Sequence, residues 1–266
     1  MQPLSQLPVQ TAANIQYVLC DIDDTVTTEG KLTAKAYSAM QALHDHGIGV
    51  IPITGRPAGW CDHIARMWPV QAVVGENGAF YMRYAHTTHK MEMRFWTDAV
   101  TRKLNRDKLN VLSDEILRLV PGCALASDQP YRVADLAIDF CEDVDPLPES
   151  AVQKIVTLFE QAGATAKVSS IHVNGWFGQY DKLTMTRRLF EEVYGESLNE
   201  LQSRTLFIGD SPNDAPMFEF FDQSVGVANV TDQLHRLKAR PKYVCDGRGG
   251  DGFAQMAEAI IASHNL

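Results

Sequence analysis

Residues 17–25 read Tyr17-Val18-Leu19-Cys20-Asp21-Ile22-Asp23-Asp24-Thr25, an apolar run that passes into acids. A short apolar run bounded in this way predicts a buried strand whose carboxyl end carries the polar groups. Side chains two apart in an extended segment point to the same side, so Asp21 and Asp23 can converge on one centre. Two neighbouring carboxylates repel each other unless a cation neutralises them or one is protonated. A capped turn at a strand end is the alternative explanation for an Asp-x-Asp taken alone.

Three further polar segments occupy comparable positions. Thr54-Gly55-Arg56 follows the apolar run 51–53, and its hydroxyl, backbone N–H groups and following helix could cradle a phosphate. Gly209-Asp210-Ser211-Pro212-Asn213-Asp214 follows the apolar run 206–208, and Lys182 lies at the start of a predicted helix. Open α/β sheets bind ligands at the carboxyl ends of their strands. Taken alone, Thr54 could equally be an ordinary helix cap. Lys182, taken alone, could equally be a solvated surface lysine.

The alternation of strands and amphipathic helices predicts an α/β fold with a mostly parallel sheet. The regular alternation of strands and helices changes in the middle of the chain. No cluster of acids lies directly at a strand end there. We therefore expect an inserted α+β domain at residues 82–179, which interrupts a core formed by residues 1–81 and 180–266. Within the insert, the expected strands are 91–96, 136–140 and 167–173, and the expected helices are 101–120 and 150–161.

Taken together, the order Asp21-x-Asp23, Thr54, Lys182 and Gly209-Asp210-x-x-Asn213-Asp214 resembles the four motifs of the haloacid dehalogenase superfamily of phosphohydrolases. The resemblance covers residues 17–80 and 181–264. It implies a Rossmann-like core with helices on both faces of the sheet. The long insertion looks like the α/β cap of the class II, subtype B branch, and Asn77-Gly78-Ala79 is similar to a segment that often precedes that cap. The general layout is most similar to sucrose-phosphate phosphatases and other sugar-phosphate phosphatases.

The resemblance also implies roles for individual residues. Asp21 would attack phosphorus to form an aspartyl-phosphate, and Asp23 would act as the general acid and base. Thr54 and Lys182 would bind the phosphoryl oxygens. Mg²⁺ would be held by the Asp21 carboxylate, the Asp23 backbone carbonyl and Asp210, with Asp214 as a ligand or as the partner of one. The expected substrate-binding residues are Gly55, Arg56, Asn77 and Asn213, whereas Asp24 is expected to be structural.

The implied activity is Mg²⁺-dependent hydrolysis of a small phosphate ester, a sugar phosphate, between the core and the cap. A phosphomutase of the phosphomannomutase type is one alternative, because the same aspartyl-phosphate could pass to a sugar hydroxyl. A non-catalytic regulator that binds a phosphorylated ligand is another, although no motif residue is lost. Trp176, Phe177 and Tyr180 are expected to pack in a core or hinge, with an aromatic wall facing a sugar as the alternative.

Composition narrows the classes of partner. The 266 residues contain 24 Lys and Arg against 33 Asp and Glu, a formal charge of −9, which argues against a general nucleic-acid binder. Five scattered cysteines without a C-x-x-C pair favour reduced thiols over a disulfide framework or a zinc site. The first sixteen residues lack the cationic start and apolar run of a signal peptide, and no run of ~18 apolar residues occurs. We therefore expect a cytoplasmic protein without a membrane partner.

Overall fold

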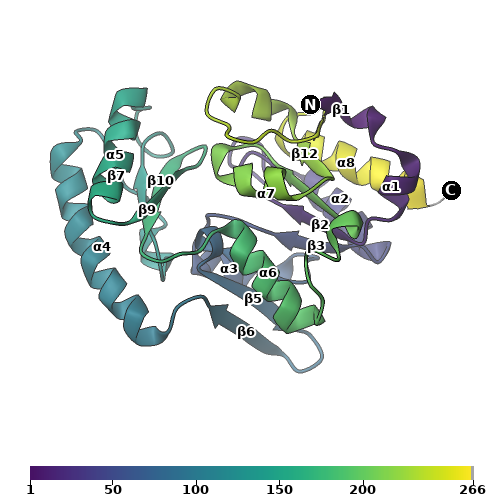
Figure 1. Ribbon diagram of the computed structural model, residues 1–266, viewed down its shortest axis with the longest axis horizontal. Helices are drawn as coiled ribbons and strands as arrows, with labels where there is room; N and C mark the ends of the chain where they lie inside the picture. The colour runs from purple at the N-terminus through teal and green to yellow at the C-terminus, as the bar shows by residue number, and fades with distance from the viewer. Residues whose placement is uncertain (265–266) are drawn as a thin grey trace.

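The computed structural model describes residues 1–264 and is built around a six-stranded sheet (Figure 1). Every neighbouring pair of strands in this sheet is parallel. The predicted α/β fold with a mostly parallel sheet is therefore confirmed. In spatial order the strands are β1 (Gln2–Pro3), β13 (Tyr243–Val244), β12 (Ser224–Gly226), β11 (Thr205–Gly209), β2 (Tyr17–Cys20) and β3 (Gly49–Pro52).

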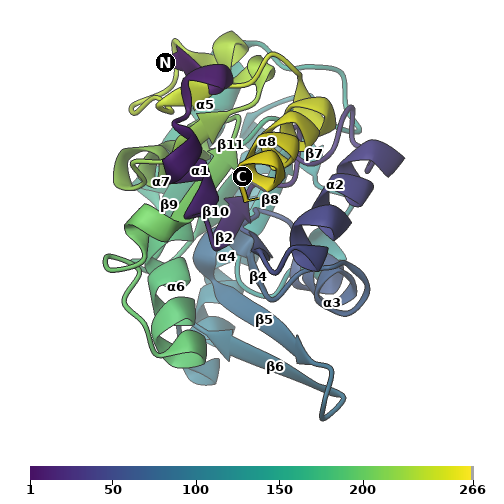
Figure 2. The ribbon, with the colours of Figure 1, turned by 90° about the vertical axis from the view of Figure 1, so that its right-hand side faces the viewer.

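The central strands are buried on both faces, which explains why they read as continuous apolar runs. In β2, Val18 and Cys20 point into one hydrophobic cluster and Leu19 points into another on the opposite face. Helices cover both faces, as the family resemblance implies, and Figure 2 shows them on the two sides of the sheet. The first cluster includes residues of α2 (Ala34–Asp45), α3 (Ala58–Met67) and α8 (Gly249–His264), and the second includes residues of α6 (Lys182–Leu189) and α7 (Ala215–Phe220).

The middle of the chain forms two antiparallel sheets. The first is a three-stranded sheet of β4 (Val73–Gly75), β5 (Phe80–Ala85) and β6 (Lys90–Phe95). The second contains β7 (Ala124–Leu125), β8 (Leu136–Asp139), β10 (His172–Trp176) and β9 (Thr165–Val168). Helices α4 (Ala99–Leu119) and α5 (Glu149–Gln161) pack on the second sheet around their own hydrophobic cluster, at the left of Figure 1.

Strand β5 crosses the domain boundary expected between residues 81 and 82, and it pairs with β4 on one side and β6 on the other. We propose that the separately packed insert begins after β6.

The single strand expected at residues 167–173 is wrong, because the chain turns back within it. Strands β9 and β10 pair antiparallel across this turn. The Ser169 hydroxyl oxygen accepts the backbone N–H groups of Ile171 and His172, and the Ser169 N–H donates to the His172 carbonyl. A serine side chain thus satisfies the backbone groups that a continuous strand would pair across a ladder.

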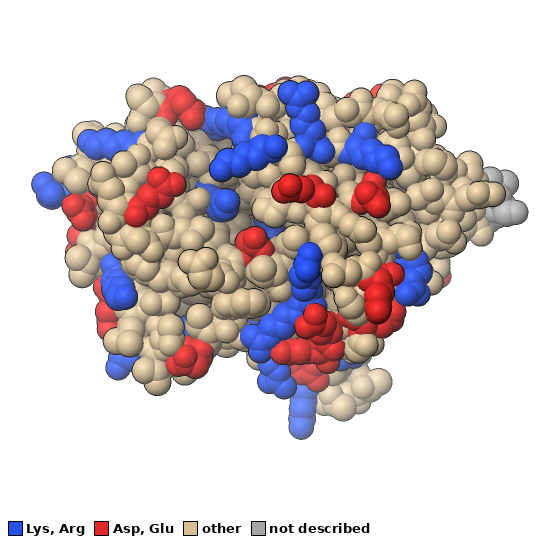
Figure 3. Space-filling view, in the orientation of Figure 1, with Lys and Arg blue, Asp and Glu red and all other residues tan. Residues whose placement is uncertain are grey.

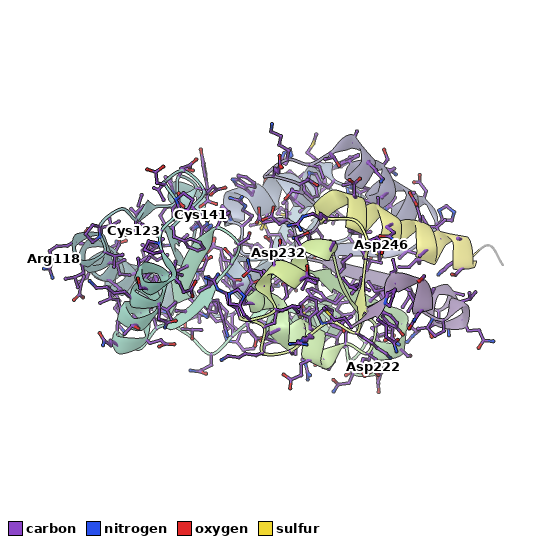
Figure 4. The ribbon with its side chains drawn as sticks, turned by 90° about the horizontal axis from the view of Figure 1, so that it is seen from above. Arg118, Cys123, Cys141, Asp222, Asp232 and Asp246 are labelled. Atoms are coloured by element: carbon purple, nitrogen blue, oxygen red, sulfur yellow. The ribbon has the colours of Figure 1, made fainter. Side chains whose placement is uncertain are left out.

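All five cysteines are free thiols. Cys20, Cys61 and Cys245 are buried in the core, whereas Cys123 and Cys141 belong to the insert (Figure 4). Basic and acidic side chains are interspersed over the face shown in Figure 3. Within residues 1–264, no helix combines the length and the apolar character that crossing a membrane requires.

The turn between β4 and β5 has an unusual backbone. Glu76, Asn77 and Gly78 all have positive φ, at 44°, 54° and 106°. A Cβ atom on Gly78 would lie 2.1 Å from the carbonyl oxygen of Asp181, the residue that precedes α6. Only glycine therefore lets this turn approach the start of α6 so closely.

We predict that Gly78→Ala lowers the free energy of unfolding by about 3 kcal/mol, because backbone strain adds to a collision with backbone atoms. Gly163→Ala is the matched control, since Gly163 also has a positive φ but open space around its Cα. Urea denaturation of both variants measures the difference. Equal losses would show that the contact with Asp181 contributes nothing.

Candidate active site

The motif segments meet at one edge of the parallel sheet. Asp21 follows β2, Thr54 lies just beyond β3, and Asp210 follows β11, and these three strands are neighbours in the order β11-β2-β3. Parallel strands end at the same edge, so the polar groups that follow them are brought together. Helix α6 adds Lys182 from its first turn, where Asp181 and Thr184 form a reciprocal capping box.

Lys182 joins two buried carboxylates. Its Nζ lies 2.6 Å from Oδ1 of Asp21 and 2.7 Å from Oδ1 of Asp214. The other Asp214 oxygen accepts the backbone N–H groups of Asp210 and Ser211 at 3.1 and 3.2 Å. Asp214 thus fixes both the lysine and the turn after β11.

A third carboxylate lies beside this pair. One oxygen each from Asp21, Asp210 and Asp214 lie within 4.8 Å of one another, and all three residues are buried. Asp210 also accepts hydrogen bonds from the Thr25 hydroxyl and the Asn229 amide. Burial raises the pKa of Asp21 to about 8 and also raises the pKa of Asp210. The single positive charge of Lys182 cannot neutralise three carboxylates. The three carboxylates are therefore a donor set that fits a hard divalent cation.

Asn77 lies beside Thr54, because its backbone N–H donates to the Thr54 carbonyl oxygen at 3.0 Å. Asn77 Oδ1 accepts the Asn213 amide at 3.2 Å, while Asn77 Nδ2 is buried without a hydrogen-bond partner in the described chain. Thr54 is also buried, and its hydroxyl oxygen accepts the backbone N–H of Arg56 at 3.0 Å. A buried amide donor in this position is able to donate to a phosphate oxygen.

Asp23 and Arg56 form an ion pair. The Arg56 Nε–H donates to both Asp23 oxygens at 2.9 and 3.0 Å. Arg56 also reaches Asp128 and Glu142 of the insert at 3.3 and 2.9 Å, and it lies over the Trp60 ring at 4.3 Å. The structure therefore places Arg56 in the site, but its guanidinium is already occupied by carboxylates.

The insert contributes acids that were not expected near the site. The insert also has acids at a strand end, contrary to the expectation from its sequence: β8 ends at Asp139, which accepts the N–H groups of Cys141, Glu142 and Asp143. This turn positions the Glu142 carboxylate to form an ion pair with Arg56. The signal was present as an acid after the apolar run 136–138, followed by two more acids.

A second ion-pair group ties the insert to the core. Arg132 donates to Asp128, to Asp135 and to the carbonyl oxygen of Gly55. The Glu76 carboxylate accepts the backbone N–H groups of residues 133–135 of the insert and of Ala58 of the core. Burial raises the pKa of Glu76 to about 7. No local sequence pattern pointed to these contacts.

These groups enclose a small cavity. Asp21, Asp23, Gly55, Arg56 and Asn213 all line it, so five residues expected in the site share one space. The other lining residues are Arg132, Ser169, Ser170, Ile171, His172, Asn174 and Ser211. The aromatic residues expected to pack do so instead of lining the cavity. Trp176 and Tyr180 stack at 5.5 Å in the core cluster, and Phe177 packs on the cluster of the insert.

We predict that Lys182→Ala lowers the free energy of unfolding by about 3 kcal/mol in the absence of divalent ions, because it leaves Asp21 and Asp214 without their cation. Lys35→Ala is the control, since Lys35 pairs with Asp251 on the surface and its loss should be much smaller. Chemical denaturation with a chelator present gives both values. Similar losses for the two variants would contradict a central role for Lys182.

Comparison with known proteins places the chain in a family. A family model for haloacid dehalogenase-like hydrolases matches residues 18–106 and 180–256, more than half of the chain. A curated phosphoglycolate phosphatase from Methanothrix thermoacetophila is 25% identical over 251 residues, which cover 94% of this chain and 98% of that protein.

Solved structures also share the fold. A sugar phosphatase of haloacid dehalogenase subclass IIB has a TM-score of 0.63 at 13% identity, over 91% of this chain and 98% of its own. The sucrose-phosphatase of Synechocystis sp. PCC6803, solved with sucrose and phosphate, has a TM-score of 0.60 at 15% identity, over 92% and 98%. This likeness confirms the predicted fold, a mostly parallel core sheet with an inserted α+β domain. The chain belongs to the haloacid dehalogenase-like hydrolases.

Proposed function

We propose that this protein is a Mg²⁺-dependent phosphatase that hydrolyses a small phosphate ester, a sugar phosphate, through an aspartyl-phosphate on Asp21. The observation that carries the proposal is the cluster of Asp21, Asp210 and Asp214 around Lys182, at the edge of a cavity closed by the insert. The phosphatase class agrees with the family and with the phosphatases among its relatives.

In the first half-reaction, a carboxylate oxygen of Asp21 attacks phosphorus and the bond from phosphorus to the alcohol oxygen breaks. Asp23 donates a proton to the departing alkoxide, so the alcohol leaves neutral. In the second half-reaction, Asp23 takes a proton from water as the water cleaves the aspartyl-phosphate. The products are inorganic phosphate and the regenerated Asp21 carboxylate. Asp21 and Asp23 line the same cavity, and both half-reactions require this proximity.

Other residues would hold the phosphoryl group. Lys182 and Thr54 would bind its oxygens, and the Asn77 amide, which has no partner among residues 1–264, would supply a further donor held in place by Asn213. Asp21, Asp210, Asp214 and the Asp23 backbone carbonyl are the groups that would hold Mg²⁺. When bound, Mg²⁺ reduces the repulsion between an anionic nucleophile and an anionic phosphate.

We predict that the purified protein releases phosphate from a panel of sugar phosphates with Mg²⁺, and that Asp21→Asn lowers kcat/KM by about 10³-fold or more because it removes the nucleophile. Phosphate release is measured colorimetrically. Equal activity in the two proteins would reject Asp21 as the nucleophile. Isomerised sugar phosphate formed with a hexose bisphosphate, without phosphate release, would support the phosphomutase instead.

We also predict that Mg²⁺ at about 100 times its Kd stabilises the wild-type fold by ~2.7 kcal/mol, because it binds the folded state only. Asp210→Asn should lose most of this gain, since it removes one of three clustered carboxylates. Thermal unfolding with and without Mg²⁺ measures the effect, with ionic strength matched by KCl. A wild-type midpoint that does not respond to Mg²⁺ would contradict the metal site.

A further inference from the structure

Strand β12 brings a further polar residue to the active edge of the sheet. It is the neighbour of β11 and runs parallel to it, so the two strands end at the same edge. Asp210 directly follows β11, and Asn229 lies three residues beyond β12, in the short helical segment Ala228–Gln233. The Val227 N–H donates to the Gly209 carbonyl oxygen at 3.2 Å and holds the two strand ends together. This pairing places Asn229 within reach of Asp210.

The side-chain amide of Asn229 uses both of its polar atoms. Its Nδ2 donates to Oδ2 of Asp210 at 3.1 Å and to the backbone carbonyl oxygen of Asp24 at 2.9 Å. Its Oδ1 accepts the backbone N–H of Gly249, the first residue of α8, at 2.9 Å. Two acceptor oxygens require the amide nitrogen, and one N–H donor requires the amide oxygen. These three partners therefore fix which way the amide points.

The start of α8 reaches the site because it is rich in glycine. Residues 247–252 read Gly-Arg-Gly-Gly-Asp-Gly. Gly249 has a φ of +49°, and a Cβ atom on it would lie 2.6 Å from the carbonyl oxygen of Thr27. The Gly250 N–H donates to the Thr28 hydroxyl oxygen at 3.0 Å. Glycine thus lets α8 pack directly against the turn that follows β2.

Both carboxylate oxygens of Asp210 have a hydrogen-bond donor. Oδ1 accepts the Thr25 hydroxyl at 3.2 Å, and Oδ2 accepts the Asn229 amide. Asp210 is 3% exposed, so these two donors rather than bulk water set the orientation of its carboxylate. Asp24, the other acceptor of the Asn229 amide, directly follows Asp23, whose backbone carbonyl is among the groups proposed to hold Mg²⁺. Asn229 therefore joins two segments that would supply metal ligands.

We propose that Asn229 is a positioning residue of the metal site, which orients Asp210 and holds residues 21–24 beside it. This inference rests on the proposed Mg²⁺ site and adds to it a residue outside the four motifs. Groups that hydrogen-bond a metal ligand fix its orientation, and their loss typically weakens metal binding by about 10- to 100-fold. Mg²⁺ requires near-ideal octahedral geometry, whereas Ca²⁺ accepts flexible arrangements of oxygen ligands. A misoriented Asp210 therefore weakens binding of Mg²⁺ more than binding of Ca²⁺.

The test measures binding of Mg²⁺ and of Ca²⁺ to the full chain by calorimetry. We expect Asn229→Ala to raise the Kd for Mg²⁺ by about 10- to 100-fold and the Kd for Ca²⁺ by a smaller factor. Asn105→Ala is the matched control, because Asn105 is also half-buried and its Nδ2 donates to a backbone carbonyl oxygen, that of Phe177. Asn105 lies on α4 of the insert, so its variant should bind both ions as the wild type does.

The outcomes separate this inference from the proposed function. An unchanged Kd for Mg²⁺ in Asn229→Ala would overturn the inference and leave the phosphatase standing. Equal weakening of both ions would also overturn it, because a general loss of the site does not discriminate between them. A selective loss of Mg²⁺ affinity would support the inference even if no ester were hydrolysed, a result that would reject the phosphatase alone. A wild type that binds neither ion would overturn both the inference and the metal site.

A second variant keeps the test decisive if circular dichroism shows that Asn229→Ala is unfolded. Asn229→Asp retains the size of the side chain and an acceptor for the Gly249 N–H, but it removes the donor to Asp210. Its added negative charge attracts two divalent ions alike, so the ratio of the Kd for Mg²⁺ to the Kd for Ca²⁺ reports geometry rather than charge. We expect this ratio to rise above the wild-type value. A ratio equal to that of the wild type would overturn the role of Asn229.

Discussion

The ammonium of Lys182 between the carboxylates of Asp21 and Asp214 is the interaction around which the active edge of the sheet is organised. Burying charged groups is unfavourable unless each has a partner and a hydrogen-bond network. Lys182 meets this condition only if α6 begins at Lys182, capped by Asp181, and if the N–H groups of Asp210 and Ser211 hold Asp214 in the turn after β11. Gly78 then permits the turn after β4 to lie against α6. One buried lysine thus links three segments, which carry Asp21, Lys182 and Asp214, and the turn at Gly78 packs against the start of α6.

The parts of this arrangement that depend on local pattern were predictable. Apolar runs such as 17–20 and 206–208 identify buried strands, and acids within two residues after them mark the carboxyl edge of the sheet. Parallel strands end at the same edge of a sheet. The sequence alone therefore predicts that Asp21 and Asp210 lie close together, although they are far apart along the chain. Their assigned roles remain proposals, whereas the family and the fold are established by comparison.

The contacts between the core and the insert were not predictable from local pattern. Arg132 donates to Gly55 and Glu76 accepts from residues 133–135, and both contacts exist only because the insert docks on the core. The turn at Ser169 was missed because Ser169 and Ser170, in an otherwise apolar and basic run, carry little signal until the Ser169 hydroxyl meets nearby N–H groups. Arg56 illustrates the same limit, since its position in the site was expected but its occupation by Asp128 and Glu142 was not.

The pairing of β2 with β11 has a consequence for synthesis of the chain. Leu19 is in register with Phe207, so the two central strands of the core are adjacent although the whole insert lies between them in the sequence. Translation produces β2 and β3 early, but β2 lacks its other neighbour until residues 205–209 have left the ribosome. The insert has its own hydrophobic cluster and is complete before that point. During translation, the nascent core therefore exposes an open strand edge while the cap is already available to fold.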